Sequence, residues 1–416
     1  MDDSARWPDC ARLLAHVLAV QGNYRGLSRG YPVTGRAEAV FGELFHRAGR
    51  YLVERSGYRE AREPVETALE LRERVHGRRS PQWAETKLCH AALLYRLAEL
   101  GAARTAVETA QGVREEIAGP EDPGLHAFLM WRCRILVEFS ELAQAQRAAE
   151  RAHRLLVAAG VPEGDHRRIE ADDLRVTVLW RRGAFRAALR LMERGVAVQR
   201  ESRGDADDRT LVALGRMAYI EQEMGAVLGD RALLCRARDR LVEVGAVLAA
   251  RYSEEHFEVM EQRRALGAAL CGLGDFAAAA RLLAPVVAAY REALGDHPST
   301  VAAERVYAVA LFHEGEAARA DALMLAGCAL YESLYGPDHP YAAEILADHG
   351  ALLAARGEAA EAAGALHRSR RIYEERYGPE HPKLVQILLD LAALPGLPVD
   401  EAAAMRGRAE RIRARI

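Results

Sequence analysis

Three loops of this chain repeat one short motif at a fixed spacing. They read Gly295-Asp-His-Pro, Gly336-Pro-Asp-His-Pro and Gly378-Pro-Glu-His-Pro, and successive histidines of these loops are 42 residues apart. A period of this length is typical of stacked, identical supersecondary units. The chain is therefore expected to be a repeat array, and such arrays bind other molecules along an extended surface more often than they build a single catalytic pocket.

Each repeat is expected to be a helical hairpin. An apolar helical run follows each His-Pro pair, and a second break follows at Gly274, Gly315 and Gly357. A small residue early in the second helix extends the pattern to other parts of the chain, at Ala61, Ala103, Ala145, Ala188, Ala279, Ala320, Ala362 and Ala404. Small residues at one recurring position allow neighbouring helices to pack closely. The fold class is thus all-α, a right-handed superhelical solenoid of about nine hairpins.

The domain organisation follows from this spacing. We expect an N-terminal helix over residues 1–22, a glycine-rich loop over 23–35 and the repeat array over 36–416. The predicted units are 36–77, 78–120, 121–162, 163–204, 205–253, 254–295, 296–336, 337–378 and 379–416. The fifth unit, 205–253, is irregular, with seven extra residues placed within 225–238. This insertion is interpreted as a hinge, a contact site or neutral drift.

Composition excludes several functional classes. The formal net charge is −3, which argues against a dedicated nucleic-acid or membrane protein. The six cysteines show no disulfide framework and no signal peptide is recognisable, so a reduced, cytoplasmic protein is expected. His297, His339 and His381 occupy equivalent loops one repeat apart and are expected to cap helices and not to share a metal ion. No cofactor, metal site or catalytic residue is expected, and a monomer is favoured.

The hairpins resemble tetratricopeptide repeats. The small helix position, the glycine at the inner turn and the acidic-His-Pro loop carry this resemblance over residues 36–416. The 42-residue period resembles the long variety found in kinesin light chains. Those proteins grip peptide backbones with paired asparagines, but here the corresponding places hold Arg264-Ala265, Arg305-Val306 and Ala347-Asp348. Their ligand therefore cannot be transferred to this chain.

The segment from Arg6 to Leu18 adds a weaker resemblance. It is similar to the helix that joins the ATPase module of actinobacterial STAND (NB-ARC-type) proteins to their repeat arrays. This resemblance implies that the chain is the sensor region of such a switch and has an ATPase module or partner protein upstream. The chain itself contains no phosphate-loop motif, and its two lysines, Lys87 and Lys383, fall in the hairpins.

The candidate binding residues are arginines and aromatic residues at or beside the positions that face the concave groove in tetratricopeptide proteins. They are Arg47, Arg50, Trp131, Arg134, Arg175, Trp180, Arg264, Arg305 and Phe312. One interpretation is that the arginines only pair with glutamates one helical turn away, as Arg264 would with Glu261. The other is that guanidinium groups beside tryptophan bind a carboxylate, a phosphate or an acidic peptide.

Three functional hypotheses remain at this point. The preferred one is a non-enzymatic scaffold that binds a protein or peptide, possibly acidic, as the sensing region of a bacterial STAND-type signalling ATPase. The alternatives are a stand-alone adaptor or peptide-pheromone receptor, and an enzyme with a site in the groove. The groove arginines are expected to face solvent, so replacing Arg134, Arg264 or Arg305 by alanine should weaken ligand binding and leave folding almost unchanged.

Overall fold

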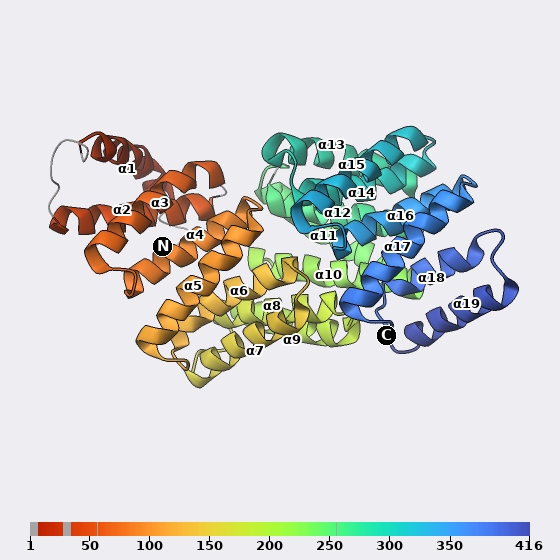
Figure 1. Ribbon diagram of the computed structural model, residues 1–416, viewed down its shortest axis with the longest axis horizontal. Helices are drawn as coiled ribbons and strands as arrows, with labels where there is room; N and C mark the ends of the chain where they lie inside the picture. Colours follow the sequence, from red (N-terminus) through yellow and green to blue (C-terminus); the bar gives the residue numbers. More distant parts are fainter. Residues whose placement is uncertain (1–6, 28–34, 56, 255) are drawn as a thin grey trace. The chain divides into compact units, whose positions relative to one another are not determined.

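The structure, a computed structural model, describes residues 7–27, 35–55, 57–254 and 256–416. These residues form nineteen α-helices and one short 3-10 helix, and no strand occurs among them (Figure 1). The predicted all-α solenoid is therefore confirmed. The chain divides into two compact units, unit 1 (Met1–Pro162) and unit 2 (Glu163–Ile416), which are described separately.

Unit 1 contains seven α-helices and the 3-10 helix. Their bounds are α1 Trp7–Leu27, α2 Gly35–Glu54, α3 Tyr58–His76, α4 Pro81–Arg96, α5 Leu100–Ala118, η2 Pro123–Leu125, α6 His126–Glu138 and α7 Leu142–Ala158. Helix α1 continues to Leu27, so the loop predicted to begin at residue 23 begins later. The rest of that predicted loop, residues 28–34, lies outside the described residues.

Unit 2 contains twelve α-helices. Their bounds are α8 His166–Arg181, α9 Phe185–Arg203, α10 Asp208–Leu228, α11 Arg231–Arg251, α12 Phe257–Leu273, α13 Phe276–Leu294, α14 Pro298–His313, α15 Ala317–Tyr335, α16 Pro340–Ala355, α17 Ala359–Tyr377, α18 Leu384–Ala393 and α19 Val399–Arg413. From α2 onward the helices of both units pair in sequence into nine hairpins. The even-numbered helix of each pair is called its first helix, and the odd-numbered helix its second.

The predicted small positions hold the two helices of each hairpin together. Seven of the eight predicted alanines, from Ala61 to Ala362, are completely buried. Glycines of the facing first helices complete the contact, because a methyl group on Gly350 would lie 2.7 Å from Cγ of Leu366. The prediction fails in the ninth hairpin, where Ala404 is exposed and Ala402 is buried in its place. The short α18 shifts the repeat there by two residues.

The loops between hairpins depend on glycine and histidine. Gly336 and Gly378 end their helices with φ of 93° and 92°, as predicted, in a region that strains any residue with a side chain. Nδ1 of His256, His297, His339 and His381 accepts a hydrogen bond from the backbone N–H two residues on, at 3.1 to 3.4 Å. The predicted capping role of the histidines is therefore confirmed. Asp338, in the same loop as His339, accepts a hydrogen bond from Arg371 at 2.8 Å.

The irregular fifth hairpin differs from the others in helix length. Its helices α10 and α11 each have 21 residues, whereas α14 and α16 have 16 and α15 and α17 have 19. The seven extra residues thus lengthen the helices and leave a tight turn at Gly229. Gly225 lies inside α10, where a methyl group would be 3.0 Å from Leu234.

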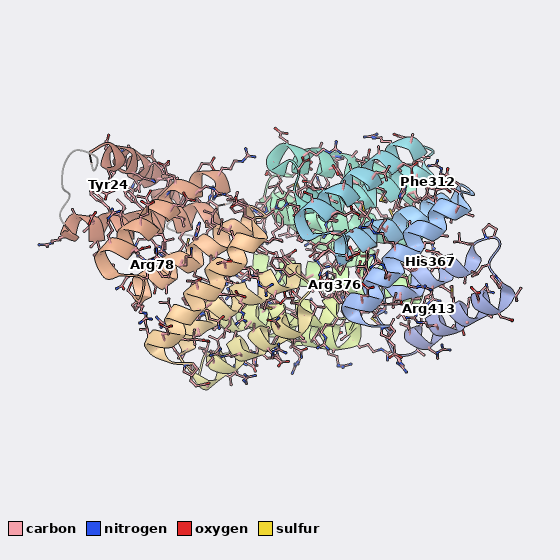
Figure 2. The ribbon with its side chains drawn as sticks, in the orientation of Figure 1. Tyr24, Arg78, Phe312, His367, Arg376 and Arg413 are labelled. Atoms are coloured by element: carbon pink, nitrogen blue, oxygen red, sulfur yellow. The ribbon has the colours of Figure 1, made fainter. Side chains whose placement is uncertain are left out.

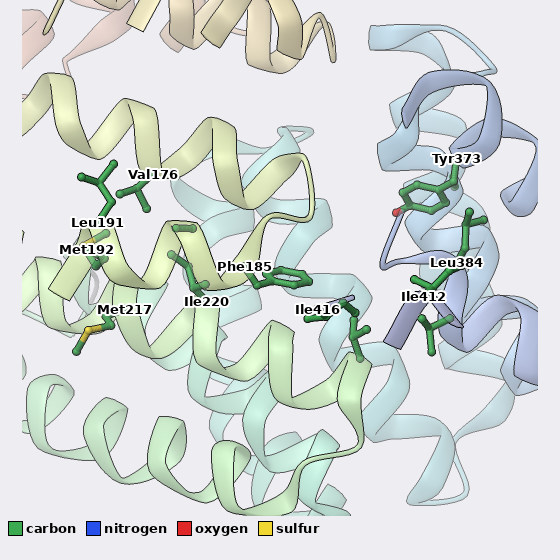
Figure 3. Close-up of a cluster of buried hydrophobic side chains, with 14 of the residues drawn as sticks. Val176, Phe185, Leu191, Met192, Met217, Ile220, Tyr373, Leu384, Ile412 and Ile416 are labelled. Atoms are coloured by element: carbon green, nitrogen blue, oxygen red, sulfur yellow. The ribbon is translucent and has the colours of Figure 1, made fainter. Parts of the chain in front are cut away.

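Unit 2 has two large apolar clusters. One joins side chains of α12–α16. The other, which we name the closing cluster, joins α8–α12 with α16–α19 and includes Val227. Figure 3 shows Phe185 and Ile220 of this cluster together with Ile412 and Ile416. Hairpins at the two ends of unit 2 therefore share one apolar core.

The first prediction concerns the buried alanines. We expect Ala362→Leu to lower the free energy of unfolding by about 1–3 kcal/mol, because the larger side chain must force the helices of the eighth hairpin apart. Ala360→Leu is the matched control, since Ala360 is exposed in the first turn of the same helix. Urea denaturation followed by circular dichroism checks this. Equal stability of the two variants would contradict the proposed packing role.

Candidate ligand-binding site

Charged side chains from the first helices of four successive hairpins meet in unit 2 with the lysine that precedes the first helix of the next hairpin. We name this group the central network, and its members are Glu223, Glu261, Arg264, Arg305, Glu344, Asp348 and Lys383. Glu223 lies on α10, and Lys383 immediately precedes α18. Because the hairpins repeat, residues at corresponding positions of their first helices share one face of the stack.

Arg264 lies at one end of the central network. Its guanidinium group pairs with Glu261 one turn earlier on α12, at 2.7 Å. The hydroxyl of Tyr290 donates to the same carboxylate at 2.6 Å, and Arg264 lies 5.3 Å from the ring centroid of Tyr219. The pairing expected between Arg264 and Glu261 is therefore present, and it already occupies this guanidinium group.

Arg305 and Lys383 share the carboxylates of α16. Arg305 donates to Asp348 and lies 3.7 Å from Glu344. Lys383 lies 3.8 Å from Glu344 on the other side and pairs closely with Glu223. Glu344 thus stands between two cations at distances longer than a direct hydrogen bond.

Mutual charge stabilisation keeps these groups ionised. Burial opposes ionisation of Glu344, but Lys383 and Arg305 outweigh it and lower its pKa to about 2. Burial likewise opposes the charge of Lys383, but Glu223 and Glu344 raise its pKa above the ordinary range. Burial and the nearby charge of Asp348 raise the pKa of Asp390 on α18.

Aromatic side chains border the central network on the side of α8. The rings of Trp180 and Tyr219 pack edge to face with centroids 5.2 Å apart. The guanidinium carbon of Arg181 lies 4.5 Å from the ring centroid of Trp180 and 4.9 Å from that of Tyr341, whose hydroxyl accepts a hydrogen bond from Arg181 at 2.9 Å. All three rings are half-buried, so part of each faces solvent.

The predicted binding residues of unit 2 lie in different surroundings. Arg264 and Arg305 belong to the central network and Trp180 borders it. Arg175 pairs with Asp172 at 2.8 Å on its own helix, and Phe312 packs in the other apolar cluster and against His313 (Figure 2). The expectation that the arginines face solvent is wrong for Arg264 and Arg305, whose side chains are only 13% and 17% exposed. Both guanidinium groups are buried because they form ion pairs with carboxylates of the central network.

The predicted residues of unit 1 form a separate set. Arg47 pairs with Glu43 at 2.5 Å and Arg50 with Glu54 at 2.9 Å, each on its own helix. Arg134 lies 4.9 Å from the ring centroid of Trp131, which packs edge to face on Tyr95. These contacts are within single helices or between adjacent hairpins.

Sequence reasoning missed Lys383 and Glu223 as members of the site. Lys383 is one of only two lysines among the 57 basic residues of the sequence. Its rarity could have drawn attention to this position, because almost every other basic residue is arginine. No signal pointed to Glu223, because it meets Lys383 only through a contact between the fifth and ninth hairpins.

Three further properties bear on what the described part of the chain can do. Within the described residues, no group of three or more histidine, cysteine, aspartate or glutamate side chains is placed to hold a metal ion. Burial lowers the pKa of His381 to about 4, so this histidine is neutral at pH 7 and remains a cap. As for membranes, none of the described helices combines the length and apolarity needed to cross one.

The second prediction tests whether the central network supports the fold. Arg305→Ala should lower the free energy of unfolding by about 1–3 kcal/mol, because Asp348 and Glu344 lose their cation. Arg47→Ala is the control, since Arg47 is 65% exposed in a pair of the i, i+4 type, and its loss should cost less than about 0.5 kcal/mol. Chemical denaturation of both variants measures the difference. If both variants lowered the free energy of unfolding by the same small amount, Arg305 would be a surface residue that does not support the fold.

Comparison with known proteins places the repeats in a family. A family model described as tetratricopeptide repeat matches residues 44–82, 259–299, 308–341 and 343–383, which together make up less than half of the chain. No curated protein matches the sequence.

Several solved structures are similar to the chain. The apo form of the quorum sensor NprR from B. thuringiensis matches with 12% identity over 90% of this chain and 97% of its own, with a TM-score of 0.51. A putative kinesin light chain with nearly identical TPR-like repeats from Podosopora anserina matches with 21% identity over 51% of this chain and 98% of its own, with a TM-score of 0.38. A Rap protein complexed with Competence and Sporulation Factor matches with 12% identity over 99% of this chain and 98% of its own, with a TM-score of 0.40.

At these identities the similarity to NprR concerns the fold alone, and it agrees with a helical repeat array over most of the chain. The matched segments fall on hairpins of both units and include the loops with the three His-Pro motifs. The chain therefore contains tetratricopeptide repeats.

Proposed function

We propose that this chain is a non-enzymatic scaffold that binds a peptide or protein segment, and that the central network is its binding face. The observation that supports this proposal most directly is the convergence of charged side chains from five hairpins on one face of unit 2. Their side chains are mostly buried, yet those of Glu344, Asp348 and Lys383 retain some contact with solvent. A ligand can therefore reach groups whose positions are already fixed by ion pairs, which reduces the entropy lost on binding.

The charge of the central network favours a ligand with a cationic group. Its four carboxylates exceed its three cations. An ammonium or guanidinium group of a ligand can pair with Asp348 and Glu344 without displacing a native carboxylate. An acidic ligand would instead have to compete with the carboxylates already bound to Arg264 and Arg305. The proposed ligand is thus a peptide with a basic side chain or a free amino terminus, opposite in charge to the acidic partner expected from the sequence.

The aromatic border offers a second kind of contact. Trp180, Tyr219 and Tyr341 present ring surfaces beside the charged groups. Apolar or aromatic side chains that flank the cationic group of a peptide can pack on these rings. A mixed face of this kind suits a short linear sequence with alternating charged and apolar residues.

The cellular setting stays a prediction. The settings considered are a sensing region of a STAND-type ATPase, a stand-alone adaptor and a peptide-pheromone receptor. A phosphate-loop ATPase encoded in the same frame or in the adjacent gene, and co-purifying with the chain, would support the sensor; an adaptor needs no such partner. Cytoplasmic location likewise remains an expectation.

The third prediction tests the binding face. On an array of charge-varied peptides, the purified chain should capture peptides with lysine, arginine or a free amino terminus, and Asp348→Asn should weaken capture by about 5- to 150-fold, the effect of losing one charged hydrogen bond. Asp338→Asn is the matched control, because Asp338 pairs with Arg371 outside the central network. The affinities of both variants and of the unchanged chain for the best-captured peptides are then measured by titration calorimetry.

Two outcomes would count against the proposal. Equal affinity of the Asp348 and Asp338 variants would remove the central network as the binding face. Capture restricted to acidic peptides would overturn the proposed charge of the ligand and restore the arginines as its principal contacts.

A further inference from the structure

The insertion in the fifth hairpin contains residues that contact the last hairpin of the chain. Ala237 follows Ala218 by 19 residues, whereas the equivalent pairs Ala308–Ala320 and Gly350–Ala362 are 12 residues apart. The seven extra residues therefore lie between Ala218 and Ala237, a stretch that includes Glu223 and Val227. This places the insertion at the end of α10 and the start of α11.

The lengthened end of α10 contacts the ninth hairpin in three ways. The carboxylate of Glu223 pairs with Lys383. The backbone oxygen of Val227 accepts a hydrogen bond from Nε of Arg413, at 3.0 Å. The Val227 side chain is buried in the closing cluster, which also contains Ile412 and Ile416 of the ninth hairpin. Polar, backbone and apolar contacts thus join the same two segments.

The turn between α8 and α9 makes a neighbouring contact with the same hairpin. Nε2 of His381 donates to the backbone oxygen of Arg181 at 3.1 Å. Gly183 has φ of 77°, and a methyl group placed on it would lie 2.3 Å from Cδ of Pro382. Arg181 also donates to Tyr341 on α16. The fourth and fifth hairpins are therefore in contact with the eighth and ninth.

Such contacts have no counterpart in a linear repeat array, where each unit touches only its neighbours. We infer that the lengthened end of α10 and the turn between α8 and α9 together form a clasp that closes unit 2 on itself by binding the ninth hairpin. The clasp consists of Glu223 and Val227 on α10, Arg181 and Gly183 at the α8–α9 turn, and their partners His381, Pro382, Lys383 and Arg413.

The clasp and the central network share Glu223 and Lys383. If the proposed function holds, a ligand group that pairs with Glu344 or Asp348 changes the charge that Lys383 experiences and hence its pairing with Glu223. Ligand binding and closure of unit 2 are then coupled, because the same ion pair contributes to both. This coupling rests on the proposed function, whereas the clasp does not.

The fourth prediction tests the clasp in the chain without ligand, by hydrogen exchange and mass spectrometry. Gly183→Ala should accelerate exchange in α18 and α19 at least tenfold, because the added methyl group displaces Pro382. Gly357→Ala is a closely matched control: Gly357 occupies the same turn of the eighth hairpin with φ of 83°, and nothing lies within 4 Å of its added methyl group. The double variant Gly183→Ala, Pro382→Ala should restore slow exchange in α18, because it removes the clash.

A variant on the other side of the contact tests the clasp independently, in case Gly183→Ala misfolds. Arg413→Ala should accelerate exchange at the end of α10, residues 223–228, whereas Arg411→Ala on the same turn of α19 should not. Slow exchange across the contact in both Gly183→Ala and Arg413→Ala would overturn the clasp. If the clasp holds but a captured peptide leaves exchange at α10 and α18 unchanged, the coupling is wrong and the clasp stands.

Discussion

The close contact between the two helices of each hairpin is the constraint on which the rest of the structure depends. A completely buried alanine near the start of the second helix in each of the first eight hairpins, such as Ala61 or Ala362, allows that helix to approach the first one. Glycines such as Gly350 on the facing helix allow the same approach from the other side. Because this contact recurs with the repeat, the first helices present corresponding residues on one face. The central network exists because that face carries charged residues in five successive hairpins.

Closure of unit 2 adds what the repeat alone cannot provide. A stack of hairpins has only nearest-neighbour contacts, and its stability is a sum of local terms. Here the lengthened α10 reaches the ninth hairpin, so Glu223 meets Lys383, and the closing cluster joins both ends of unit 2. The buried ion pairs contribute less net stability than their number suggests, since desolvation offsets much of the attraction. Their value lies in fixing the positions of charged groups that a ligand can use.

The fold was largely predictable from the sequence, because each hairpin is specified by short-range signals. Glycine at the loops, histidine caps and buried alanines recur with the period, and the nine predicted units match nine observed hairpins. The predictions failed where the period breaks, as at Ala404 after the short α18. The candidate site was less predictable: the sequence proposed Arg264 and Arg305 as groove residues, but it did not predict their burial. Contacts between the fifth and ninth hairpins decide the role of Lys383, and periodicity carries no information about hairpins that are not adjacent.

The most direct test of this account is a hydrogen-exchange footprint of the chain bound to the cationic peptide that it captures best. If the central network is the binding face, protection should appear in the first helices α10, α12, α14 and α16 and at the start of α18. The second helices α11, α13, α15 and α17 should change little. Protection confined to the second helices, or to unit 1 alone, would contradict the proposal that unit 2 binds its ligand through the central network.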